Sequence, residues 1–132
     1  MRTFNPFALL VLLVAQSAST QAADLSGAWT VDASACGDIF TKENNKLAFK
    51  PDADLHAGGV IVQGKQITGT FQKCTVKSLR DDGANVQVTA SCSDGVAVSD
   101  VTFDVKMSGE NNFTLSSKAP VPVEMQYARC SL

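Results

Sequence analysis

Apolar and polar residues alternate along most of the chain, which is the pattern of half-buried β-strands. Val86, Val88 and Ala90 share one side of such a strand, and the odd-numbered positions from Val101 to Met107 share one side of another. Turn-forming residues recur about every ten positions, so the strands between them are short. The pattern predicts strands at residues 25–31, 46–50, 59–63, 66–72, 75–80, 85–92, 98–107, 113–117 and 123–130.

Two connections predict tight turns, and one segment breaks the alternation. Gly64-Lys65 is a two-residue hairpin connection that begins with glycine, and residues 81–84 contain Asp-Asp-Gly. Residues 33–45 lack alternation and predict one or two turns of helix, capped by Asp32 or Ser34. We therefore expect an all-β fold, a small antiparallel up-and-down barrel of about seven or eight strands with one short helix after the first strand. A two-sheet β-sandwich is the alternative.

The interior of a small barrel is filled by side chains, so the larger apolar residues of the strands should point inward. The pattern does not determine whether the side chains leave a cavity. The expected fillers are Phe49, Phe71, Phe103, Val60, Val62 and Val105.

The first 22 residues have the three-part order of a secretory signal peptide. One positive charge at Arg2 precedes an apolar run at residues 7–15, and small and polar residues follow. Cleavage after Ala22 fits best, with cleavage after Ala23 as the alternative. The apolar run is shorter than the roughly 20 residues that a membrane-spanning helix needs. We expect residues 1–22 to be removed, leaving one domain at residues 23–132 in the periplasm or outside the cell.

The charge of the remaining 110 residues argues against two classes of partner. With Arg2 removed, ten basic residues face 13 acidic ones, a net charge of −3. The lysines are scattered among acids, whereas a nucleic-acid footprint needs a basic cluster. The same scatter disfavours an anionic membrane surface.

Four cysteines in an exported domain of this size indicate two disulfides. A zinc site is disfavoured because no two of them stand in a Cys-x-x-Cys hook. Of the three possible pairings, the hairpin around residues 81–84 favours Cys74–Cys92, which leaves Cys36–Cys130.

The register of that hairpin supports the choice. If Cys74 lies opposite Cys92, Val76 lies opposite Ala90, residue 78 opposite residue 88, and residue 80 opposite residue 86. This register places apolar residues together on one face of the hairpin.

Candidate catalytic and metal-binding groups are few. Asp52, Asp54 and His56 would point to one side of an extended chain and could then hold a divalent metal. A solvated loop is the favoured interpretation, because Pro51 and Gly58-Gly59 bracket the segment. No acid pair is singled out for glycoside chemistry, and no Gly-x-Ser-x-Gly motif accompanies His56. We therefore predict no cofactor and no enzymatic activity.

Trp29 in the first strand and Arg129 in the last strand form the most suggestive pair. If those strands are neighbours, the guanidinium would stack on the indole and close one end of the barrel. The alternative is that Trp29 belongs to the core and Arg129 to the surface.

Gly27-Ala28-Trp29 and Arg129 resemble the Gly-x-Trp motif and the closing arginine of lipocalin-like (calycin) barrels. Residues 25–39, Leu-Ser-Gly-Ala-Trp-Thr-Val through Cys-Gly-Asp-Ile, are also similar to the start of bacterial Inh-type inhibitors of secreted metalloproteases. Those inhibitors are compact eight-stranded barrels whose N-terminal segment enters the protease cleft. The chain departs from them in having four cysteines rather than two, and in having only residues 23–26 ahead of Gly27 after cleavage.

These observations predict an exported, non-enzymatic binding module for a small ligand or a protein, with inhibition of a secreted or periplasmic protease as the alternative. The resemblance implies the barrel and the inhibitor activity, and the residues imply the export and the disulfides.

Overall fold

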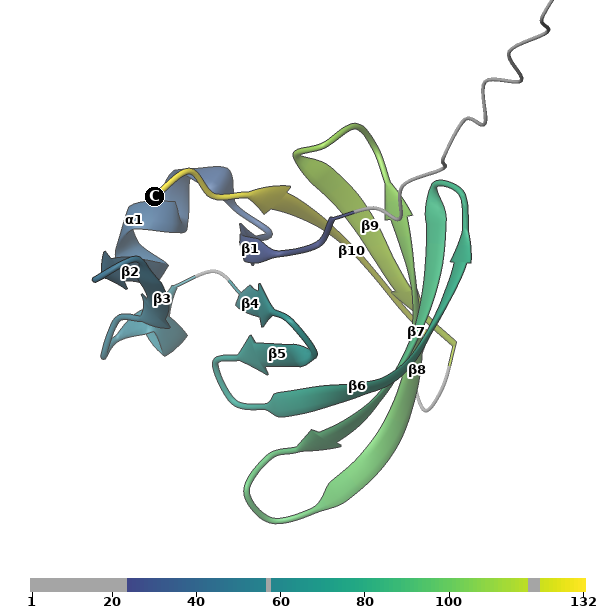
Figure 1. The fold of residues 1–132 in the computed structure, drawn as a ribbon. Coiled ribbons are helices and arrows are strands. Elements are labelled where there is room, and N and C mark those ends of the chain that lie inside the picture. The colour runs from purple at the N-terminus through teal and green to yellow at the C-terminus, as the bar shows by residue number, and fades with distance from the viewer. Residues whose placement is uncertain (1–23, 57, 119–121) are drawn as a thin grey trace, which may run out of the picture.

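Eight antiparallel strands close into a barrel in the computed structural model, which describes residues 24–56, 58–118 and 122–132. Strands β4 to β10 follow one another around the ring, and β1 closes it by pairing with both β4 and β10 (Figure 1). The barrel strands are β1 (Gly27–Thr30), β4 (Gly59–Gln63), β5 (Gln66–Gly69), β6 (Lys73–Asp82), β7 (Asn85–Ser93), β8 (Val98–Met107), β9 (Asn112–Ser117) and β10 (Val123–Arg129). The predicted all-β barrel is confirmed.

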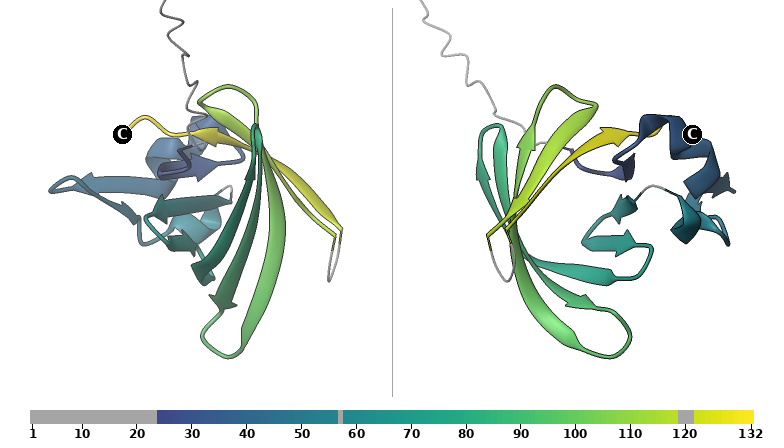
Figure 2. Two further views of the ribbon diagram at one scale, coloured as in Figure 1. Left: turned by 45° about the vertical axis from the view of Figure 1, so that its right-hand side comes forward. Right: turned by 180° about the vertical axis from the view of Figure 1, so that it is seen from behind.

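Between β1 and β4 the chain leaves the barrel and forms a small block. Its elements are η1 (Ala33–Ala35), α1 (Cys36–Ile39), β2 (Phe40–Glu43), β3 (Lys46–Phe49) and η2 (Ala53–Leu55). Figures 1 and 2 show the block beside β1 and β4. Ala28 and Ile61 share a buried cluster with Ile39 and Phe40. Since strand residues alternate between faces, this second core lies on the outer side of the barrel wall.

Only the first half of the predicted helix forms. Asp32 is the N-cap and accepts a hydrogen bond from the backbone N–H of Ser34 at 2.9 Å. From Phe40 onward the chain is a hairpin, because Asn44 and Asn45 adopt φ values of 52° and 62° and make a tight two-residue turn. Phe40 then packs on Phe49 with 5.2 Å between the ring centroids, a contact that a continued helix would not provide.

The hairpin of β6 and β7 differs from its predicted register after Val76. Cys74 faces Cys92 and Val76 faces Ala90 as predicted, but a β-bulge shifts the next pairs to Ser78 with Thr89 and Leu79 with Val88. The shift turns Leu79 to the same face as Val88, where the predicted register placed a serine. It also moves Asp81 opposite Val86, where Arg80 was expected, so the turn contains only residues 83 and 84.

Two of the expected interior residues lie elsewhere. Phe71 is 72% exposed, because β5 ends at Gly69 and the residue falls in the connection to β6. Phe49 belongs to the outer cluster, where it packs against Phe40. Val60, Val62, Phe103 and Val105 point into the barrel and line its interior.

Candidate functional site

Arg129 closes one end of the barrel together with Trp29. The two residues face each other across β10 and β1, and the Arg129 Cζ atom lies 4.1 Å from the centroid of the Trp29 ring system. This places the guanidinium over the face of the indole, the geometry of a cation–π contact. Trp29 is completely buried, so the indole belongs to the core and also supports the arginine.

The same guanidinium fastens two loops across that end. Its Nη2 donates to the carbonyl oxygen of Asp24 at 2.9 Å, and its Nη1 donates to the carbonyl oxygen of Ser26. Its Nε and Nη2 donate to the carbonyl oxygen of Glu110 at 3.2 and 3.1 Å. The segment before β1 and the β8–β9 connection are thereby fixed by one side chain whose planar fork suits several acceptors.

The segment before β1 folds against the barrel rather than projecting from it. Leu25 packs on the inner cluster, and its carbonyl oxygen accepts a hydrogen bond from Nε1 of Trp29 at 2.9 Å. Hydrogen bonds from the backbone N–H and the side chain of Ser26 hold the pKa of the Asp24 carboxyl below its usual value, and the charge of Arg129 adds to this. The described residues before β1 are therefore part of the barrel end.

An aromatic group continues inward from Trp29. Its indole meets Phe113 edge-on with 4.7 Å between centroids, and Phe113 stacks on Tyr127 at 5.0 Å. Burial raises the pKa of the Tyr127 hydroxyl, because the ionised form loses its water.

The barrel interior contains an apolar cavity of about 210 Å³. Phe113 forms part of its wall, so the aromatic group and the cavity are in contact. The residues that line the cavity come from β4 to β9 and from the segment before β1. They are Leu25, Ser26, Val60, Val62, Gly64, Ile67, Val76, Leu79, Asp81, Val86, Val88, Phe103, Val105, Phe113 and Leu115. Twelve of these are Val, Ile, Leu or Phe, whose side chains are suited to an apolar ligand.

The cavity reaches the surface beside the β6–β7 hairpin. Leu79 lines it and is 61% exposed, and Asp81 lines it and is also exposed. Gly64 of the β4–β5 turn and Ser26 complete this rim, which we call the mouth. Ser26 belongs to the segment that Arg129 holds, so the arginine positions one side of the mouth.

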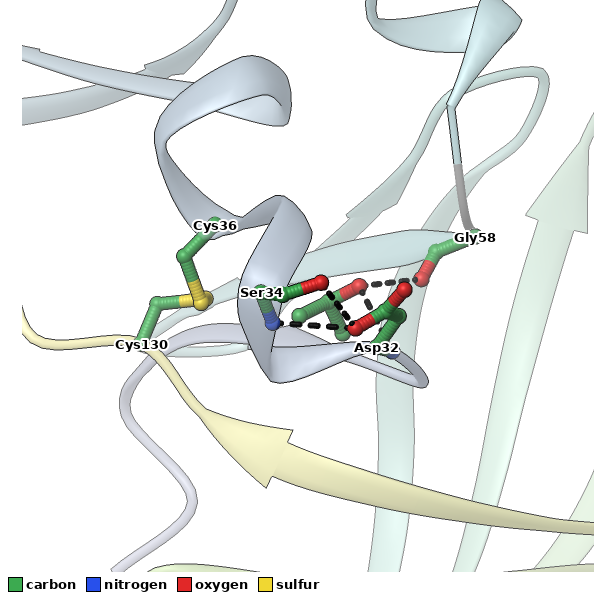
Figure 3. Close-up of a disulfide and its surroundings, with 6 residues drawn as sticks. Asp32, Ser34, Cys36, Gly58 and Cys130 are labelled. Carbon is green, nitrogen blue, oxygen red and sulfur yellow. Dashed lines mark hydrogen bonds between the residues drawn. A yellow bond between two sulfur atoms is a disulfide. The ribbon is translucent and has the colours of Figure 1, made fainter.

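The two disulfides lie in different parts of the molecule. Cys74–Cys92 joins opposite residues of β6 and β7, and both cysteines are buried in the inner cluster with Ala90, away from the mouth. Cys36–Cys130 ties α1 to the residue after β10, beside the turn where Asp32 caps η1 by accepting a hydrogen bond from Ser34 (Figure 3). The first therefore crosslinks the two strands of one hairpin, and the second joins the outer block to the end of the last barrel strand.

The acidic segment around the only histidine is not assembled into a site. Asp52 is the N-cap of η2, Asp54 lies within that 3₁₀ turn, and His56 ends it, so the extended chain assumed for a metal site does not form. All three side chains are exposed. In the part of the chain that the structure describes, no group of three or more His, Cys, Asp or Glu residues is arranged to hold a metal.

The sequence pattern does not predict two cavity residues or the hairpin of the outer block. It places Asp81 in a turn and does not assign Leu79 to the interior, because the bulge between Val76 and Ser78 has no strong sequence signal. The hairpin at residues 40–49 could have been found from Asn44-Asn45, since adjacent asparagines tolerate the left-handed conformation of such turns.

Comparison with protein-family models, with curated proteins and with solved structures finds no match to this chain. The closed eight-stranded barrel is consistent with a calycin-like architecture. The predicted signal peptide, residues 1–22, lies outside the described residues. Among the helices described, none has the length and apolar character needed to cross a membrane.

Proposed function

We propose that this chain is an exported, non-enzymatic binding protein that holds a small apolar ligand inside its barrel. The single observation that carries the proposal is the cavity of about 210 Å³, walled by apolar side chains and open beside Leu79. Apolar cavities of about 150 Å³ stay dry and take up benzene, so a cavity of this size suits a ligand part of about eight to ten non-hydrogen atoms.

The chemistry of the wall supports binding rather than catalysis. Asp81 is the one ionisable side chain among the residues that line the cavity. Proton-transfer catalysis commonly uses a second positioned group, which the wall does not supply. Within the described part of the chain, no buried side-chain polar atom lacks a hydrogen-bond partner, so the interior offers no unpaired polar group to a reacting substrate.

The proposed location is the periplasm or the extracellular space. Two disulfides are characteristic of oxidising compartments, and residues 1–22 have the pattern of a signal peptide. Inhibition of a secreted or periplasmic protease stays a prediction from residues 25–39. Its test is incubation with a panel of secreted metalloproteases, and undiminished activity of all of them would contradict it.

Octanol titration tests the proposed binding. Trp29 is the only tryptophan of the chain and touches Phe113 of the cavity wall, so its fluorescence should report occupancy. We expect saturable binding with a Kd on the order of 0.1–1 mM, from typical affinities per non-hydrogen atom. Native mass spectrometry of protein purified from its own cell envelope would look for a retained ligand.

A matched pair of variants locates the binding. Val62→Phe adds a ring inside the cavity, whereas Val98→Phe adds the same ring at a position that is 72% exposed on the outside. Octanol binding should be lost in Val62→Phe and kept in Val98→Phe, with near-ultraviolet circular dichroism showing that both are folded. Equal binding by both folded variants would place the ligand elsewhere and contradict the proposal.

A further inference from the structure

A carboxylate lies at the mouth of the cavity. Among the described residues, Asp81 is the one charged side chain that lines the cavity, and its register opposite Val86 turns it toward the barrel interior. Arg80 and Asp82, on either side of it, alternate to the opposite face of β6.

No described residue forms an ion pair with the Asp81 carboxylate. In the described part of the chain the ion pair is Lys77–Asp100, on the outer surface, and Asp81 accepts no hydrogen bond. Asp24, Asp32 and Asp94 differ, because each accepts hydrogen bonds from neighbouring residues. Lys65 is next to Gly64 in the turn at the mouth and makes no ion pair with Asp81.

We propose that the cavity selects ligands with an apolar body and a cationic end, such as small primary amines. This inference rests on the proposed function, and it adds the chemical class of the ligand. The apolar body would occupy the cavity, and the ammonium group would lie at the mouth beside Asp81, still in contact with water. A carboxylate ligand of equal length would place its charge against Asp81, and the formal net charge of −2 of the whole chain would add to that repulsion.

The position of Asp81 at the mouth suits discrimination between ligands by their charge. At an exposed mouth an ion pair contributes little affinity, and a good pair changes binding by only about twofold to fivefold. The apolar wall would therefore supply most of the affinity, and Asp81 would discriminate by charge, favouring cations over anions.

Three ligands of one chain length test the charge preference: octylamine, octanol and octanoate, titrated into the disulfide-bonded protein at low ionic strength. We expect octylamine to bind most tightly and octanoate most weakly. Asp81→Asn should weaken octylamine binding roughly threefold to fivefold and leave octanol unchanged. Asp82→Asn is the matched control, because it removes the same charge from the outer face of the same strand, and it should change little.

Salt gives a second measurement that needs no variant. Raising sodium chloride to about 0.5 M should reduce the preference for octylamine over octanol, because ions screen an exposed pair. Equal affinities for all three ligands, or an unchanged octylamine affinity in Asp81→Asn, would overturn the charge selection while octanol binding upheld the proposed function. Absence of binding by all three ligands would overturn both.

Discussion

Replacing Arg129 with methionine should open the end of the barrel that the arginine closes. The substitution keeps an unbranched apolar stem over Trp29 and removes the guanidinium. Three backbone carbonyl oxygens, those of Asp24, Ser26 and Glu110, then lose their donor. The segment before β1 loses its link to the last strand, although the hydrogen bond from Trp29 to the Leu25 carbonyl remains.

The magnitude follows from the two kinds of contact that disappear. A cation–π contact over tryptophan contributes about 0.5–2 kcal/mol. Hydrogen bonds to a charged donor contribute about 1.5–3 kcal/mol each when they are buried, and Arg129 is only partly buried, so water replaces much of what is lost. We expect the free energy of unfolding to fall by about 2–3 kcal/mol, which in a domain of this size lowers Tm by roughly 10–15 °C.

The assay is urea unfolding of the disulfide-bonded protein, followed by fluorescence of the single tryptophan. Arg80→Met is the matched control, because Arg80 is exposed on β6, and its loss should change the unfolding free energy by less than about 0.5 kcal/mol. Arg129→Lys should recover only part of the loss, since an ammonium group cannot reproduce the planar fork. A loss below about 0.5 kcal/mol in Arg129→Met, or full stability in Arg129→Lys, would refute this account of the barrel end.

Three further perturbations probe the outer core, the interior and the link between the chain ends. Gly59→Ala should destabilise the fold by about 1–3 kcal/mol, because a Cβ atom there would come within 2.6 Å of the Phe40 ring; unchanged thermal unfolding would contradict it. Tyr127 has a raised pKa, so its contribution to stability is complete below the pKa of about 10 of an unfolded tyrosine and is lost as the pH rises through the folded value. Tyr127→Phe should remove that alkaline loss, and ultraviolet titration of this only tyrosine should give a pKa above that of free tyrosine; a normal value would contradict the burial argument. Replacing Cys36 and Cys130 together by serine, across a separation of 94 residues, should cost about 4 kcal/mol in urea unfolding; a loss under about 1 kcal/mol would show that the barrel does not depend on this link.

The strand pattern of the barrel could be predicted because alternation is a local property. Residues such as Val86, Val88 and Ala90 repeat with the period of a strand, so their side is determined before any partner strand is known. The Cys74–Cys92 pairing followed from the same local information, since the short turn brings these two residues opposite each other. Trp29 and Arg129 could be singled out only as a pair that would meet if the chain ends were neighbours.

Tertiary structure decided the cavity and its chemistry. The bulge after Val76 shifts the register by one residue, and because side chains alternate with period two, that shift exchanges which of them face inward. Leu79 and Asp81 become part of the cavity for this reason. The cavity itself depends on how side chains from seven separate segments fill a closed ring, and Phe49 and Phe71, expected inside, lie outside it. The sequence by itself therefore determined most of the strands and the favoured cysteine pairs and indicated a barrel, whereas only long-range packing determined the closed ring, the hollow interior and the carboxylate at its mouth.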